Sequence, residues 1–155
     1  MPFSTTPISA LVMILGSALG LGTPLSASPL LPPIEWELRS PTPGAPPCRA
    51  VKFGPAIDTQ LLRNRAGDLI LVAGHGDWSH DGDPFALTIS ADGAPPMRLT
   101  GYPIGPTIFV LVEDDALEKQ IKAAHTLDWR LPWGQFRAEV EGLGKAFDAL
   151  TVCPG

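Results

Sequence analysis

The stretch FALTISADGAPPMRLT, residues 85–100, decides the fold, because it predicts two strands joined by a tight turn. Apolar and polar residues alternate over 85–90, which places one face of a strand on the side of Phe85, Leu87 and Ile89. Asp92-Gly93 is a strong turn signal, and residues 97–100 can pair back after it as a hairpin. The centre of the chain is therefore predicted to be antiparallel β-structure.

Further strands are predicted on both sides of this hairpin. Residues 69–73 (LILVA) and 107–113 (TIFVLVE) are apolar runs typical of strands that are buried on both faces. Residues 126–131 (TLDWRL) and 135–140 (QFRAEV) alternate, and Pro132-Trp133-Gly134 supplies the turn between them. Shorter strands are predicted at 50–53 and at 34–38.

Helical spacing predicts one or two helices. Residues 115–124 follow Asp114 or Asp115 as a capping residue. Near the end of the chain, apolar residues recur at the spacing of an amphipathic helix, at Leu143, Ala146, Phe147 and Leu150. A weaker pattern predicts a short helix over 57–65. We therefore expect an α+β fold, in which a mostly antiparallel β-sheet packs against one or two amphipathic helices and is closed by one disulfide.

The N-terminal segment favours export. Residues 1–27 carry no charged side chain, and residues 8–22 are entirely apolar or small. Fifteen helical residues span about 22 Å, which is less than the roughly 30 Å of a bilayer core. We interpret 1–27 as a signal peptide, with an uncleaved anchor or a buried helix as the alternatives. The predicted protein is bacterial and periplasmic or secreted.

The remaining chain divides into a lead-in and one domain. Residues 28–47 are rich in proline and predict an extended lead-in. Residues 48–155 are long enough for a single α+β domain with its own core. The formal net charge of −5 argues against nucleic acid as a partner, and contact with a membrane is expected only through an uncleaved leader.

Two cysteines, Cys48 and Cys153, bracket the predicted domain. An exported location favours a disulfide bond between them, which would close a loop of about 105 residues. The chain-entropy model assigns such a bond roughly 4–5 kcal/mol of stability. Two free buried thiols, or pairing between molecules, are the alternatives.

The densest group of potential metal ligands lies in residues 75–83 (HGDWSHDGD). The order D-x-S-x-D-G resembles the start of a calcium-binding loop, but Thr88 stands where that loop needs a bidentate carboxylate. A Zn²⁺ site is the second alternative. The main interpretation is a solvated hairpin loop between 69–73 and 85–90. No cofactor is predicted, and Ca²⁺ or Zn²⁺ would use residues drawn from His75, His80, Asp77, Asp81 and Asp83.

No catalytic residue is predicted, because no G-x-S-x-G motif occurs and paired cysteines cannot act as nucleophiles. Tryptophan concentrates at binding surfaces, although core packing is its commoner role. The candidate partner-binding residues are therefore Trp36, Trp78 and Trp133.

The C-terminal part of the chain resembles the invasion-associated locus B family of small exported bacterial proteins. The resemblance covers about 40 residues, and it rests on the helix at 115–124, the segment WRLP at 129–132 and the ending GLxxAFxxL at 142–150. This family usually has Phe at the position of Leu143, and it carries further cysteines that this chain lacks. The resemblance implies an envelope or secreted protein without established enzymatic chemistry, and it assigns no site residue.

Three functions remain open. The first is a non-enzymatic exported protein that binds an envelope protein or ligand. The second is a metal-dependent enzyme or a Ca²⁺-stabilised binder that uses residues 75–83. The third is a small periplasmic inhibitor or immunity-type protein, for which a rigid scaffold is suited.

Overall fold

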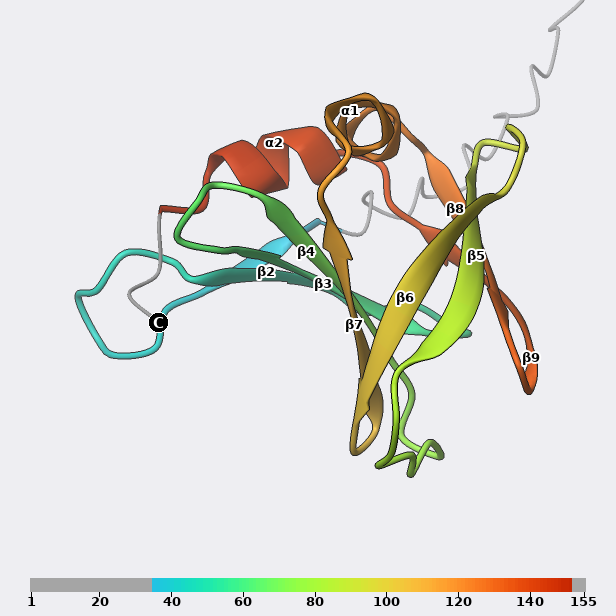
Figure 1. Ribbon diagram of the computed structural model, residues 1–155. Helices are drawn as coiled ribbons and strands as arrows, with labels where there is room; N and C mark the ends of the chain where they lie inside the picture. The colour runs from blue at the N-terminus through green and yellow to red at the C-terminus, as the bar shows by residue number, and fades with distance from the viewer. Residues whose placement is uncertain (1–34, 152–155) are drawn as a thin grey trace, which may run out of the picture. The chain divides into compact units, whose positions relative to one another are not determined.

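The structure is a computed structural model that describes residues 35–151, and these form nine strands and two short helices (Figure 1). In chain order the elements are β1 (Glu37–Arg39), β2 (Arg49–Lys52), β3 (Asp58–Arg63), β4 (Leu69–Gly74), β5 (Phe85–Ala91), β6 (Met97–Ile104), β7 (Thr107–Val112), α1 (Asp115–Lys122), β8 (Thr126–Leu131), β9 (Gly134–Glu139) and α2 (Leu143–Asp148).

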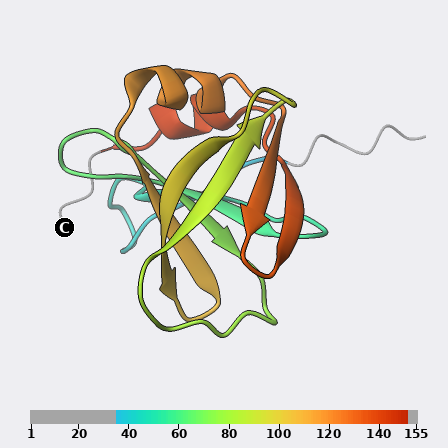
Figure 2. The same cartoon turned by 45° about the vertical axis from the view of Figure 1, so that its right-hand side comes forward.

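All nine strands belong to one strongly curved antiparallel sheet (Figures 1 and 2). Their order is β1-β2-β3-β4-β7-β6-β5-β8-β9. The first four strands pair in sequence, and β5, β6 and β7 return as a second meander that places β7 beside β4. Helix α1 then carries the chain from β7 to β8, which pairs with β5. The expected α+β class with a mostly antiparallel sheet is confirmed.

Strand β6 joins the two halves of the sheet because it changes partner along its length. Its first part pairs with β5 up to Gly101, which lies opposite Phe85. Its last three residues, from Tyr102, pair with β7 instead. A Cβ atom on Gly101 would lie 2.7 Å from Leu87 Cδ2 and 3.0 Å from Ile108 Cγ2. The absence of a side chain therefore allows the two neighbouring strands to pack closely at this change of partner.

The core fills the concave side of the sheet. The expected alternation places Leu87 and Ile89 of β5 inside, next to Leu127 and Trp129 of β8. Trp129 is fully buried, and its indole N–H has no hydrogen-bond partner in the described part of the chain. Burial in β7 also alternates, so the run at 107–113 is not buried on both faces as expected.

Both helices lie together on one side of the sheet (Figure 1). Of the two capping candidates, Asp114 caps α1, since its carboxylate accepts a hydrogen bond of 2.7 Å from the Leu117 N–H. Helix α2 buries Leu143, Ala146 and Phe147, which confirms the apolar stripe. Leu150, directly after the helix, is also buried.

Two interpretations of the first half of the domain are wrong. The helix expected over 57–65 is strand β3, because Ile57, Thr59 and Leu61 are buried in alternation, which is the period of a strand. Residues 75–83 do not join a hairpin, since β4 pairs with β3 and β7, whereas β5 pairs with β6 and β8. The chain there crosses from one half of the sheet to the other.

The lead-in contributes an edge strand to the domain. Strand β1 pairs with β2, and it lies close to the strand expected at 34–38. Cys48, which directly precedes β2, donates its backbone N–H to the Arg39 carbonyl at 2.9 Å. Cys153 and the predicted signal peptide lie outside the described residues, so the disulfide and the leader stay predictions. In the described range 35–151, no helix is long and apolar enough to cross a membrane.

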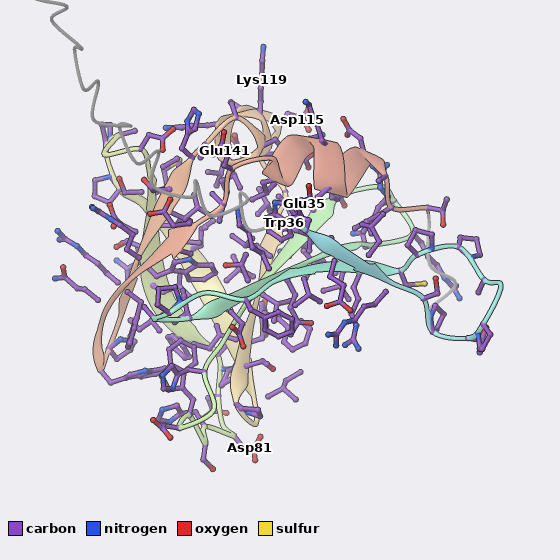
Figure 3. The ribbon with its side chains drawn as sticks, turned by 180° about the vertical axis from the view of Figure 1, so that it is seen from behind. Glu35, Trp36, Asp81, Asp115, Lys119 and Glu141 are labelled. Atoms are coloured by element: carbon purple, nitrogen blue, oxygen red, sulfur yellow. The ribbon has the colours of Figure 1, made fainter. Side chains whose placement is uncertain are left out.

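The two edges of the sheet are linked through one backbone carbonyl, that of Glu141 in the connection between β9 and α2. The indole N–H of Trp36 and the ammonium of Lys52 donate to the Glu141 carbonyl at 2.9 and 3.2 Å. Figure 3 shows Trp36 and Glu141 close together. Burial lowers the pKa of Lys52, and the carboxylates of Glu141 and Glu139 partly oppose that shift. These hydrogen bonds connect the β1–β2 edge to the end of β9.

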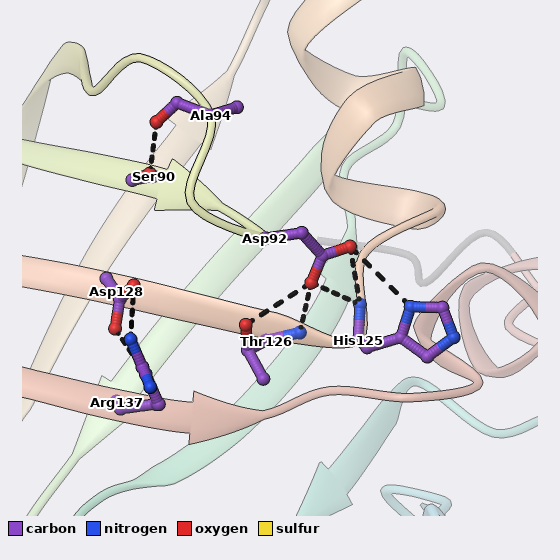
Figure 4. Close-up of polar contacts among 7 residues, drawn as sticks. All are labelled: Ser90, Asp92, Ala94, His125, Thr126, Asp128 and Arg137. Atoms are coloured by element: carbon purple, nitrogen blue, oxygen red, sulfur yellow. Dashed lines mark hydrogen bonds and ion pairs between the residues drawn. The ribbon is translucent and has the colours of Figure 1, made fainter.

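The turn between β5 and β6 is held by Asp92. Asp92 and Gly93 both have positive φ angles, 47° and 74°, as the Asp-Gly signal predicts for a hairpin. The Asp92 carboxylate accepts hydrogen bonds from the backbone N–H groups of Thr126, at 2.8 Å, and His125, at 3.0 Å (Figure 4). The Thr126 N–H is the main cause of the lowered pKa of Asp92. The turn is thereby fixed to the start of β8.

We expect Asp92→Asn to lower the melting temperature at neutral pH, with a difference from the wild type that shrinks in acid. Because the folded state lowers the pKa of Asp92, its carboxylate contributes stability above the unfolded pKa, about 4, and loses that contribution as the pH falls through the folded value. Thermal melts between about pH 7 and pH 2 test this. Asp83→Asn is the exposed control, and an Asp92→Asn difference that is constant across the pH range would contradict the prediction.

Candidate functional site

The predicted metal ligands of residues 75–83 do not converge on one point, although His75 and Asp77 contact each other. The Nδ1 atom of His75 accepts the N–H of Asp77 at 3.1 Å, whereas Asp81 accepts the N–H of Gly105 at 2.8 Å. The ring of His80 stacks against Trp133 with a centroid distance of 4.1 Å. Within residues 35–151, no three His, Cys, Asp or Glu side chains lie close enough together to hold a metal ion.

From this dispersal we expect added Ca²⁺ or Zn²⁺ to leave the melting temperature unchanged within about 1 °C, since only a ligand that prefers the folded state stabilises it. The measurement is a thermal melt with excess metal, compared with a melt in a chelator. A saturable rise in melting temperature that is lost in Asp77→Asn would contradict this expectation and restore the metal-binding hypothesis.

The 75–84 crossing instead brings aromatic residues together at one end of the sheet. Trp78 is buried and packs edge-on against Phe136 and Trp133, with ring centroids 5.2 and 5.8 Å away. Trp133, in the β8–β9 turn, is 37 % exposed and also contacts Phe85. Trp78 is therefore a core residue, whereas Trp133 keeps a surface that a partner can reach.

Trp36, the third candidate, does not join the other two. It contacts Glu141 and lines a cavity of about 500 Å³ together with Leu38, Lys145 and Ala146. Figure 3 shows Trp36 near α2 and Asp81 of the 75–84 crossing at the opposite end. The three tryptophans thus form no common binding surface.

A larger groove, about 580 Å³, lies on the outer face of β5, β8 and β9. We call it the outer groove. The 93–96 turn lines one part of it, and the polar side chains along it are Thr88, Ser90, Asp128, Arg130, Gln135 and Arg137. Strand alternation explains this composition, because the neighbours of these residues, such as Ile89 and Trp129, face the core.

Strand pairing arranges the polar side chains in two rows. In the first row Thr88 lies opposite Arg130, which lies opposite Gln135 on its other side. In the second row Asp128 lies between Ser90 and Arg137. Side chains directly opposite each other on one face are about 4.5–5.5 Å apart at Cβ, so each row forms a continuous set of polar groups.

The second row is internally paired. Both oxygens of Asp128 accept hydrogen bonds from Arg137, from Nε at 2.7 Å and from the terminal nitrogen at 3.0 Å (Figure 4). This hydrogen bonding is the main cause of the lowered pKa of Asp128, which partial burial opposes and the charge of Arg130 assists. The Ser90 hydroxyl donates to the Ala94 carbonyl. These groups already have partners within the protein.

The first row keeps its donors available. In the described part of the chain, the exposed guanidinium of Arg130 forms no ion pair within 4.0 Å. The lining thus contains two guanidinium groups and one carboxylate, an excess of one positive charge in a protein of net charge −5. The groove offers recognition by hydrogen bonds and charge. Its described lining has no histidine or cysteine, and its one serine bonds a carbonyl.

Comparison of the chain with known protein families, with curated proteins and with solved structures found no match. The resemblance to the invasion-associated locus B family therefore stays a prediction.

The sequence does not predict the outer groove. Alternation alone places Thr88, Arg130 and Gln135 on the solvent side of their strands, and the Pro-Trp-Gly turn sets Arg130 opposite Gln135. The missing information was that β5 pairs with β8, which no turn between consecutive strands encodes.

Proposed function

We propose that this chain is an exported, non-enzymatic binding module of the bacterial cell envelope, with the outer groove as its ligand site. The observation that carries this proposal is a groove of about 580 Å³ whose polar lining is partly held in place by internal pairing and partly open. Ligand sites commonly have volumes of 300–1,000 Å³ and a few convergent polar groups.

The arrangement of the lining favours binding over catalysis. A nucleophile needs an adjacent base, and the only hydroxyls in the described lining belong to Thr88 and Ser90. Ser90 donates to a carbonyl, and the nearest carboxylate, Asp128, is bound by Arg137. Ser90, Asp128 and Arg137 thus hold the shape of the groove, which is the role expected in a recognition site.

Amide-resolved NMR of the full-length chain tests where a ligand binds. The probes are soluble peptidoglycan fragments, short neutral oligosaccharides and short uronic-acid oligosaccharides. We expect shifts at the backbone amides of residues 88–90, 128–130 and 135–137. Shifts confined to residues 75–83 and Trp133, or no shift with any probe, would contradict the proposal.

Export and the disulfide are tested together by intact mass. We expect protein recovered from the periplasm or medium to lack residues 1–27 and to weigh about 2 Da less than the reduced chain, because forming a disulfide removes two hydrogen atoms. Cys48→Ser should lower stability by about 2–5 kcal/mol. Two thiols that alkylate freely in the native exported protein would contradict the bond, and recovery of the unprocessed chain from the cytoplasm would contradict export.

A further inference from the structure

We propose that the outer groove recognises a carboxylate-bearing sugar, such as a short oligosaccharide that contains uronic acid. This inference rests on the proposed function and names the ligand class of the same site. It starts from the first row of polar groups, where Arg130 is flanked by the Thr88 hydroxyl on β5 and by the Gln135 amide on β9.

The chemistry of this row fits a single carboxylate. A guanidinium presents parallel N–H donors that match the two oxygens of a carboxylate, and such charge-assisted bonds are stronger than neutral ones. Thr88 and Gln135, one on each side of Arg130, add a hydroxyl and an amide donor within reach of the same anion. Arg130 is the one groove cation in the described structure that has no ion pair of its own.

The second row fits the hydroxyl groups of a sugar. The Asp128–Arg137 pair presents fixed acceptors and donors next to the first row, and its bidentate geometry holds both side chains in one orientation. Sugar hydroxyls both donate and accept, so they can use such a pair without breaking it. A ligand that lies across both rows would place its carboxylate at Arg130 and its hydroxyls at Asp128 and Arg137.

The charge balance disfavours a highly charged anion. The excess of one positive charge in the lining matches one carboxylate, whereas the whole protein carries −5 and repels a polyanion. Arg98, opposite Thr88 on β6, extends the first row, but it lines a separate cavity of about 350 Å³ together with Glu113 and Asp114. Arg98 does not line the outer groove, so Arg130 remains the anchor.

Calorimetric titration of the exported protein with an aldotriuronate, a trisaccharide of one uronic acid and two neutral sugars that carries a single carboxylate, tests this inference. We expect binding that Arg130→Ala weakens by about 10- to 100-fold, the loss expected for a hydrogen bond to a charged group. Arg130→Lys should also weaken binding, because it keeps the charge but loses the planar fork. Arg49→Ala, which removes an exposed arginine from β2, is the matched control and should stay within about twofold.

Inorganic phosphate and the neutral sugar maltotriose separate the alternatives. Phosphate that competes as tightly as the aldotriuronate would show a simple anion site and overturn the inference. Maltotriose that shifts the groove amides while the aldotriuronate does not bind would also overturn it, but would leave the proposed binding site in place. Aldotriuronate binding that is unaffected by Arg130→Ala would show that the ligand does not bind in the groove, and both proposals would then fail.

Discussion

Phe147→Ala is expected to lower the free energy of unfolding by about 3–5 kcal/mol, the range found when a buried aromatic side chain is removed. Phe147 is 1 % exposed and connects α2 to the sheet and to α1. The guanidinium of Arg63 on β3 lies 4.2 Å from its ring centroid, and the ammonium of Lys122 on α1 lies 4.7 Å away. The alanine variant loses both the apolar contact and these cation–π interactions.

Three variants separate the contributions at Phe147. Phe147→Leu keeps most of the buried volume but removes the aromatic face, so we expect it to cost about 1–2 kcal/mol. Lys145→Ala, at an exposed position of the same helix, should change stability by less than about 0.5 kcal/mol. Urea unfolding monitored by circular dichroism measures all three, and a Phe147→Ala cost as small as that of Lys145→Ala would show that α2 is not docked as described.

Gly101→Val is expected to destabilise the fold by about 3 kcal/mol or more, and Gly101→Ala by about 1–3 kcal/mol, the usual cost of overpacking a core. A Cβ atom at this position would meet side chains of β5 and β7 at once, at 2.7 Å from Leu87, 3.0 Å from Ile108 and 3.2 Å from Phe85. The neighbours are held on both sides, so they cannot all withdraw.

A double-mutant cycle tests the cause of this cost. Leu87→Ala removes the atom closest to the new methyl group, so Gly101→Ala should cost at least about 1 kcal/mol less in that background than in the wild type. Gly76→Ala is the control, since nothing lies within 4 Å of its added Cβ, and it should be nearly neutral. Equal costs of Gly101→Ala in both backgrounds would rule out this steric explanation.

The elements that could be predicted from sequence are those defined by local signals. The β5–β6 hairpin follows from alternation and Asp92-Gly93, and α1 follows from its apolar spacing and the Asp114 cap. Strand β3 differs from the predicted helix because the adjacent Leu61 and Leu62 also suit a helical face, whereas burial alternates at Ile57, Thr59 and Leu61. Neighbouring apolar residues fit a helical face as well as a strand.

The candidate site depends on pairings that are remote in sequence. The first-row arrangement of Thr88 beside Arg130 exists only because β8 joins the sheet next to β5 after the chain has passed through β6, β7 and α1. Local propensity says nothing about that choice. By contrast, the cluster of polar residues at 75–83 suggests a metal site from sequence alone. In the structure, His75 and Asp81 bind different backbone N–H groups, and Trp78 is buried in the core.

The pairing of β4 with β7 also limits the rate at which this domain can fold. Leu69 lies opposite Val112, so a loop of about 40 residues must close before that ladder forms. Sheets with many such remote pairings fold in milliseconds to seconds, far more slowly than helical bundles. The topology that builds the outer groove therefore also limits how fast the compact domain forms.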